Sequence, residues 1–295
     1  MNAYFYHLHP FVTFLYYVGT IILIMFMQHP ISLSAVFFLI LLVHYVQDRF
    51  RSVRRWGVLI LSSGLLVFLI NPLFNERGQH LLFEILNHRF TLEAIVYGGM
   101  TALTIMSIIA LFVSYNEVMT PNKLLYLFSK FLPQFAVLLM LTLRFIPLMK
   151  RRLDEITAVQ QSKGISVVEG TWRQKAKNGL LYVQVLVTYS LEEAIQTADS
   201  MKARGYGRKQ RSSYEHYRLK RGDICSMAIL VFLFCLTLIG RLMGYGYIVV
   251  YPVMDSLSLT MIEMYFLTGF LLFVSFPLMI EGGGYIKWRI SSVKM

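Results

Sequence analysis

The chain contains six predominantly apolar stretches of about the length of a membrane-crossing helix, each with at most one charged residue. They cover residues 11–27, 31–46, 56–74, 92–115, 224–243 and 259–280. Only 15% of the residues are charged, against about 25% in a typical soluble domain. The apolar residues come in runs and not with amphipathic spacing, which indicates helices surrounded by lipid. We therefore expect an all-α integral membrane protein with about six transmembrane helices.

The basic residues cluster in a few loops, and such clusters mark the cytoplasmic side of a membrane protein. One cluster separates the second and third stretches, and another closes the chain: Arg49, Arg51, Arg54 and Arg55, then Lys287, Arg289 and Lys294. The connection 75–91 has balanced charges, as expected for an external loop. We predict a multi-pass protein of the bacterial or archaeal cell membrane with both termini in the cytoplasm. The clustering explains the net charge of +12 without a nucleic-acid partner.

Residues 116–222 are the region where hydropathy alone would mislead. Segment 124–149 is apolar and long enough to cross the membrane, but crossing would place many basic residues outside the cell. The return segment would be 180–191, which has only 12 residues and includes polar side chains. We therefore predict that this region stays at the cytoplasmic face as long helices. The predicted domains are N-terminal transmembrane helices 1–115, a cytoplasmic helical domain 116–222 and C-terminal transmembrane helices 223–295.

Two helix ends of the same design lie within this middle region, Ser162-Lys163-Gly164 and Ala203-Arg204-Gly205. The residues before each glycine have amphipathic spacing, which predicts a helix that ends at the glycine. A glycine at this place adopts the left-handed cap conformation without steric cost, and the negative end of the helix favours the cation. Each motif alone would be ordinary capping, and the amphipathic helices alone would suit anchors on anionic lipid. Their duplication on the cytoplasmic side indicates a partner that binds both ends.

Three motifs together carry a resemblance to a known family. They are Asn71-Pro72-Leu73-Phe74 at the end of the third stretch, Arg144-Phe145-Ile146-Pro147 before the first basic helix end, and Ala203-Arg204-Gly205-Tyr206-Gly207 at the second. With these motifs, most of the chain resembles the transmembrane T component of energy-coupling-factor (ECF) transporters, the EcfT/CbiQ family. The resemblance implies amphipathic coupling helices at the cytoplasmic face. It also implies a scaffold that joins two cytosolic ATPases, identical or not, to a small substrate-binding membrane subunit.

In such a scaffold both basic helix ends dock in grooves of the ATPases. The docking residues that the resemblance implies are Ser162, Lys163, Gly164, Ala203, Arg204 and Gly205. The first motif departs from the family's Ala-Arg-Gly pattern, because Lys163 keeps the charge but lacks the planar fork of an arginine. We expect the first contact to be weaker or geometrically looser than the second.

The expected function is the coupling of ATP hydrolysis by partner subunits to uptake of a micronutrient, a vitamin or cobalt and nickel, with the cargo chosen by another subunit. The phosphate-binding pattern G-x-x-x-x-G-K-[ST] does not occur, and Cys225 and Cys235 are too far apart along one helix for a disulfide. We expect no catalytic, cofactor-binding or metal-binding residues and no cofactor. The alternatives are a dedicated cobalt or nickel permease subunit of CbiQ type, a polytopic membrane enzyme, and a self-contained secondary transporter, which would have broken helices at the membrane midplane.

Overall fold

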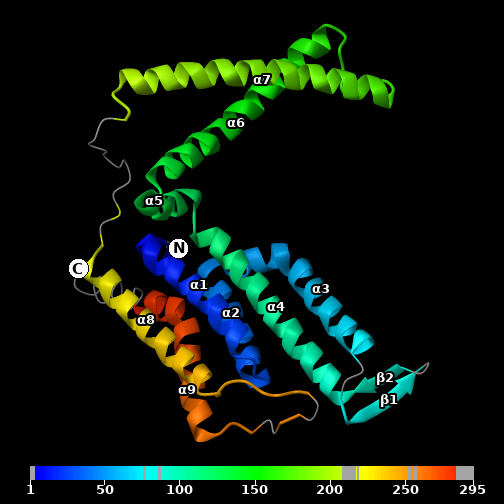
Figure 1. Cartoon of the computed structure of the whole chain (residues 1–295), viewed down its shortest axis with the longest axis vertical. Coiled ribbons are helices and arrows are strands. Elements are labelled where there is room, and N and C mark those ends of the chain that lie inside the picture. Colours follow the sequence, from blue (N-terminus) through cyan, green and yellow to red (C-terminus); the bar gives the residue numbers. More distant parts are fainter. Residues whose placement is uncertain are drawn as a thin grey trace. The chain divides into compact units, whose positions relative to one another are not determined.

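The computed structural model of the chain describes residues 4–75, 78–85, 88–207, 217, 219–251, 254–255 and 258–283. The regular structure of the described part is helical apart from one two-stranded sheet, which confirms the predicted all-α class. The chain forms two compact units: unit 1 contains Met1–Leu124 and Tyr217–Met295, and unit 2 contains Leu125–His216 (Figure 1). The basic tail with Lys287, Arg289 and Lys294 lies outside the described residues. The functional division of the chain at residues 115 and 222 stays a prediction.

The helices of unit 1 precede and follow unit 2 in the sequence. They are η1 (Tyr4–His7), α1 (Pro10–Phe26), α2 (Pro30–Asp48), α3 (Arg51–Phe74), α4 (Leu92–Val118), α8 (Arg221–Leu242) and α9 (Met261–Val274). The strands β1 (Leu81–Ile85) and β2 (His88–Thr91) form an antiparallel hairpin before α4. Unit 2 is built from α6 (Pro133–Ser162) and α7 (Trp172–Ala203), and α5 (Pro121–Phe131) crosses the boundary between the units.

Five of the described helices are long and apolar enough to cross a membrane: α2, α3, α4, α6 and α8. A bent pair, α9 with the short helix Phe276–Gly283, passes the same test, and α1 is a shorter apolar helix. The chain is therefore a multi-pass membrane protein with about the predicted number of spans. α6 qualifies by length and composition alone, so its place at the cytoplasmic face stays a prediction.

α1 lies at the centre of unit 1, although it is only 17 residues long. It packs against α4, α8 and α9, and more than half of its residues are buried (Figure 1). Two adjacent tyrosines fix it there. The hydroxyl of Tyr16 donates to the carbonyl of Val274 on α9 at 2.9 Å, and that of Tyr17 lies 2.8 Å from Oγ of Ser114 on α4. Since a buried tyrosine needs a partner for its hydroxyl, these bonds set the position of α1 between its neighbours.

A histidine followed by a proline begins both α1 and α2. Nδ1 of His9 accepts the backbone N–H of Phe11, and Nδ1 of His29 accepts that of Ile31, both at 3.3 Å. In each case the proline takes the first helical position, where its missing N–H costs no hydrogen bond. Only residues 27–29 join the two helices, because His29 caps α2 and Pro30 is already its first helical residue.

The last apolar stretch, predicted as one helix over 259–280, is broken, and this prediction was wrong. α9 ends at Val274, and the helix Phe276–Gly283 is inclined to it by 55°. Pro277 explains the break. It has no N–H to donate to the carbonyl of Phe273, and its ring would collide with that carbonyl in a continuous helix.

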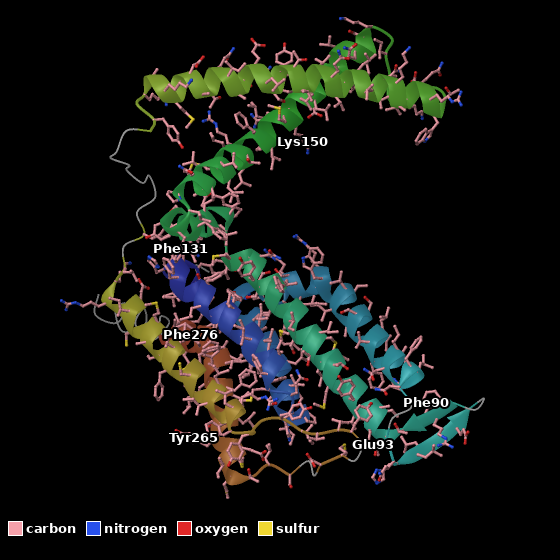
Figure 2. All side chains as sticks on the ribbon, viewed as in Figure 1. Phe90, Glu93, Phe131, Lys150, Tyr265 and Phe276 are labelled. Carbon is pink, nitrogen blue, oxygen red and sulfur yellow. The ribbon has the colours of Figure 1, made fainter. Side chains whose placement is uncertain are left out.

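The connection 75–91, predicted as an external loop, contains the β1–β2 hairpin. The buried carboxylate of Glu93 holds the base of this hairpin, because it accepts the backbone N–H groups of Gln79 and His80 and lies 2.8 Å from Nδ1 of His80. The hydroxyl of Thr91 caps the first turn of α4. Figure 2 shows Phe90 and Glu93 at this junction. The hairpin is therefore attached to the start of α4.

Candidate functional site

The first predicted helix end, Ser162-Lys163-Gly164, closes α6 and is called here the first tip. Lys163 is the cap residue, and Gly164 has a left-handed φ of 78°. The N–H of Gly164 donates to the carbonyl of Gln161, and the N–H of Ile165 donates to that of Gln160, both at 2.9 Å. These two bonds define a Schellman cap, which satisfies carbonyls that the helix itself leaves open.

The second predicted helix end, Ala203-Arg204-Gly205, closes α7 in the same way and is called the second tip. Arg204 is the cap residue, and Gly205 has a φ of 80°. Its N–H donates to the carbonyl of Lys202, and the N–H of Tyr206 donates to that of Met201, again both at 2.9 Å. The predicted left-handed glycines are confirmed at both ends, and the two backbones agree bond for bond.

The cations of the two tips are open to a partner. The side chains of Lys163 and Arg204 are exposed, as are Ser162 and Ala203 beside them. Within the part of the chain that the structure describes, neither cation has a carboxylate within 4.0 Å. Each stands at the negative end of a long helix, which stabilises a positive charge there. Both tips thus present one uncompensated cation on a fixed turn of backbone.

A third Schellman cap, at the end of α8 in unit 1, shows what the tips add to ordinary capping. Gly244 has a φ of 92°, and the N–H of Tyr245 donates to the carbonyl of Gly240 at 3.0 Å. The cap residue here is the uncharged Met243, and the nearby guanidinium of Arg241 lies over the ring of Tyr247. The cap geometry alone is therefore a general way to end a helix in this chain. Compared with this cap of α8, the two tips of unit 2 add an exposed cation at the cap position.

α6 and α7 contact each other near the middle of α6, well before the first tip. The hydroxyl of Ser190 donates to Sδ of Met149 at 2.9 Å, and the guanidinium of Arg152 lies 5.6 Å from the ring centre of Tyr189. Ile156 is buried one turn later. Figure 2 labels Lys150 on α6 in this region. Side-chain contacts thus join the two helices near the middle of α6.

One face of α7 carries an exposed apolar stripe. Its members follow one another at steps of three and four residues, which places them on one side of the helix: Leu180, Val183, Val187, Leu191 and Ile195. Each is at least half exposed, and side chains project freely along α7 within unit 2 (Figure 2). Such a surface is covered by lipid or by another apolar protein surface.

Comparison with known proteins decides the family. The family model described as "CbiQ: Cobalt transport protein" matches residues 3–214, more than two thirds of the chain and both tips. The chain belongs to the EcfT/CbiQ family. It is a T component of the ECF type, a transmembrane component of a transporter, as its motifs predicted.

Relatives of this family member are named "Energy-coupling factor transporter transmembrane protein EcfT". The relative from Staphylococcus aureus (strain 04-02981) is 25% identical over 248 residues, which are 78% of this chain and 90% of the relative. The relative from Listeria innocua serovar 6a is 26% identical over 203 residues, 68% of this chain and 71% of the relative. These names do not favour the alternative of a dedicated cobalt or nickel permease.

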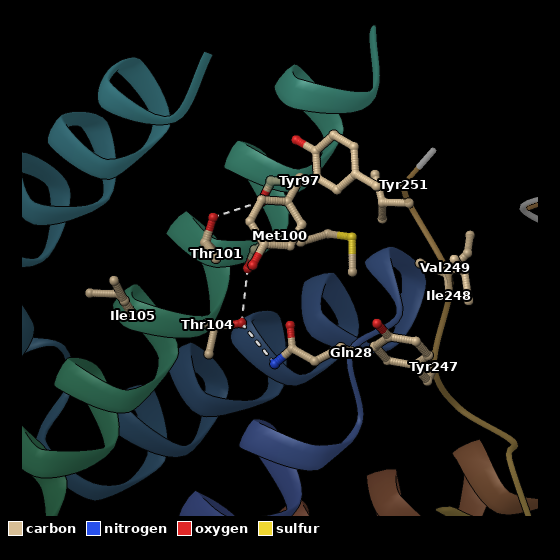
Figure 3. Close-up of a pocket in the computed structure, with 11 residues that line it drawn as sticks. Gln28, Tyr97, Met100, Thr101, Thr104, Ile105, Tyr247, Ile248, Val249 and Tyr251 are labelled. Atoms are coloured by element: carbon tan, nitrogen blue, oxygen red, sulfur yellow. Dashed lines mark hydrogen bonds between the residues drawn. The ribbon is translucent and has the colours of Figure 1, made fainter. Parts of the chain in front are cut away.

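Unit 1 of this EcfT/CbiQ protein contains a cavity of about 370 Å³ (Figure 3). The turn before α2, the first half of α4 and the segment after α8 line it, and Figure 3 shows the amide of Gln28 directed at Thr104, to whose hydroxyl it donates at 3.4 Å. None of the lining residues is charged. Among the described residues, no three His, Cys, Asp or Glu side chains form a group that would hold a metal ion. The cavity walls therefore offer no ion pair to a nucleotide phosphate or a metal ion.

Sequence reasoning missed two residues of α7 whose side chains contact the loop directly after the first tip. Tyr182 donates its hydroxyl to the carbonyl of Ile165 at 2.6 Å, and Asn178 donates to the carbonyl of Ser166 at 2.7 Å. Both lie at or next to segment 180–191, where the local pattern shows only an apolar run with polar interruptions. Their role depends on a loop that precedes α7, so no local signal reveals it.

Proposed function

We propose that this chain is the membrane scaffold of an ECF-type importer. It binds two cytosolic ATPases through the first and second tips, binds a small substrate-binding membrane subunit, and couples ATP hydrolysis to uptake of a micronutrient. The observation that carries this proposal is the pair of matching helix ends, each with an exposed cation at the cap position. The chain itself performs no catalysis in this proposal, and the ATPases supply the energy.

The chemistry of the second tip suits a groove with acidic residues. Arg204 presents a planar guanidinium that forms two parallel hydrogen bonds with one carboxylate. Ala203 and Gly205 are small, so the end of α7 approaches a partner closely. Truncating one partner of a desolvated charge pair costs about 2–5 kcal/mol, so loss of Arg204 should weaken this contact strongly.

The apolar stripe of α7 is the proposed surface for the substrate-binding subunit. A membrane subunit with an apolar flank would cover the stripe and exclude lipid from it, whereas the ATPases are soluble and would bind the charged tips. In this arrangement the tips and both chain termini lie in the cytosol, as do the arginines between α2 and α3. Movement of the tips then reaches the substrate-binding subunit through α7 itself.

Charge reversal at the second tip tests the ATPase contact. We expect Arg204→Glu to remove most of the ATPase from the purified membrane complex, because a carboxylate would meet the acidic groove. Arg151→Glu is the matched control: it makes the same charge change at an exposed position of α6 that is about 18 Å of helix before the first tip. It should keep the ATPases, and circular dichroism checks that both variants fold. Full retention of ATPase by Arg204→Glu would overturn the proposal.

A charge within the apolar stripe tests the second partner. Leu191→Glu should release the substrate-binding subunit while the ATPases stay bound, since the tips are unchanged. Gln196→Glu adds the same carboxylate at an exposed position beside the stripe and should keep both partners. Loss of the ATPases together with the substrate-binding subunit in Leu191→Glu would show that stripe and tips do not bind separate partners.

A further inference from the structure

We infer that Tyr182 and Asn178 are positioning residues that hold the first tip against the side of α7, so that one helix carries both tips. The inference rests on the proposed function for its consequence in transport. Its structural part, the attachment of the α6–α7 loop to α7, is independent of that function.

Tyr182 makes the tighter of the two contacts. Its hydroxyl donates to the carbonyl of Ile165 at 2.6 Å, and its side chain is only 4% exposed. It is the one residue of α7 that is buried. Ile165 directly follows Gly164 and donates the outer bond of the Schellman cap. The hydroxyl of Tyr182 is therefore bonded to the residue that closes the first tip.

Asn178 makes the second contact, one turn earlier on the same face of α7. Its Nδ2 donates to the carbonyl of Ser166 at 2.7 Å. The loop that follows is stiffened by Ser166 itself, whose hydroxyl accepts the backbone N–H groups of Val168 and Glu169 at 3.2 and 3.3 Å. The carbonyls of two successive loop residues are thus bonded to two positions on α7 that lie one helical turn apart.

The second tip has a different attachment. Within the described residues 203–207, the hydrogen bonds of the backbone are those of the last turn of α7. Between Tyr182 and Arg204 the helix contains neither proline nor glycine and is roughly 33 Å long at about 1.5 Å per residue. α7 is therefore a continuous rod with the second tip at its end and the first tip bonded to its side.

This attachment explains how a lysine serves where the family has an arginine. Lys163 lacks a rigid fork, so its own side chain does not fix the geometry of the contact. The two hydrogen bonds from α7 fix the backbone of the tip instead. A movement of one ATPase against the other is then passed along α7, whereas an unattached loop would absorb it.

The experiment removes the two bonds and keeps the packing. Tyr182→Phe deletes only the hydroxyl, and Asn178→Ala deletes the amide. Tyr189→Phe is the matched control, because Tyr189 also lies on α7 and contacts Arg152 through its ring. Nitroxide labels are placed at Gln161→Cys and Ser200→Cys, both exposed, in a full-length chain whose Cys225 and Cys235 are replaced by serine. Pulsed electron paramagnetic resonance measures the label-to-label distance in nanodiscs.

We expect the double variant to widen this distance distribution at least twofold, and Tyr189→Phe to leave it unchanged. In label-free complexes reconstituted in proteoliposomes, the double variant should still bind both ATPases and hydrolyse ATP. Its uptake of substrate per ATP should fall at least threefold.

An unchanged distance distribution would overturn the inference, and so would a widened distribution with unchanged uptake per ATP. Failure of the proposed function gives a different result, which is ATPase retained by Arg204→Glu. The distance measurement does not depend on the ATPases, so it tests the inference separately from the proposed function.

Discussion

The ends of α6 and α7 share the same backbone conformation but differ in their side chains and contacts. Both close with a Schellman cap on a left-handed glycine, and both place a cation at the cap position. The first tip carries a lysine, and the loop directly after it is hydrogen-bonded to the side of α7, whereas the second tip carries an arginine at the C-terminal end of α7. In the proposed complex, the cap would set the shape of each contact with an ATPase. The side chain at the cap and the hydrogen bonds that hold the tip would set the strength and the rigidity of that contact.

Substitution of the cap glycines should have the largest effect on ATPase binding at the two tips. We expect Gly205→Val to weaken ATPase binding about 30-fold or more, because a left-handed conformation costs an L-residue about 1–2 kcal/mol and the branched side chain also keeps the partner at a distance. Gly164→Val should act in the same direction. A Cβ at Gly164 would meet no atom within 4 Å in the chain itself, so crowding inside the chain does not contribute. Equilibrium binding of the purified ATPases to the chain in nanodiscs measures the effect.

Gly244→Val is the matched control for these variants. Gly244 has a φ of 92° and open space around its Cβ position, so its substitution has a similar conformational cost. It lies in unit 1 after an uncharged cap residue. This variant should unfold at a lower temperature and still bind the ATPases normally. If it loses ATPase to the same extent as Gly205→Val, general destabilisation and not docking explains the effect.

The next largest effect tests whether ATPase binding needs the planar guanidinium of Arg204 and not its charge alone. Arg204→Lys keeps the charge and loses one of two parallel hydrogen bonds, and a bond to a charged group is worth about 1.5–3 kcal/mol. We expect about tenfold weaker ATPase binding, measured at fixed ionic strength. Lys202→Arg, an exposed cation one residue before Ala203, should have little effect. Equal binding by Arg204→Lys and the unchanged chain would show that charge alone is recognised at the second tip.

The features that were predicted correctly from the sequence depend on residues that lie close together in the chain. The left-handed glycines at 164 and 205 were predictable, because a helix end depends on residues within one turn. The apolar stretches predicted most helices for a similar reason. The continuous last span was wrong because its pattern was judged by hydropathy, while Pro277 breaks the helix from within an apolar run.

The features that the sequence did not reveal depend on distant partners. Glu93 reads as one acidic residue near the start of a span, and only the fold shows it holding the base of the hairpin. Tyr182 reads as one more large residue in an apolar run, yet its hydroxyl is bonded to a loop carbonyl far before it in the chain. Neither contact has a periodic pattern, so no reading of spacing would find it.

The smallest predicted effect tests whether the two tips bind ATPase grooves of the same design or of different designs. Lys163→Arg gives the first tip the side chain of the second on the same backbone. If both ATPase grooves recognise a guanidinium, the added hydrogen bond should tighten ATPase binding. We expect a gain of only about threefold, because a groove that normally holds a lysine would not align both bonds of the fork. The gain should need the attachment to α7, so Tyr182→Phe in the same chain should reduce it. Weaker binding by Lys163→Arg would show instead that the first groove is shaped for an ammonium group, and that the two tips bind surfaces of different design.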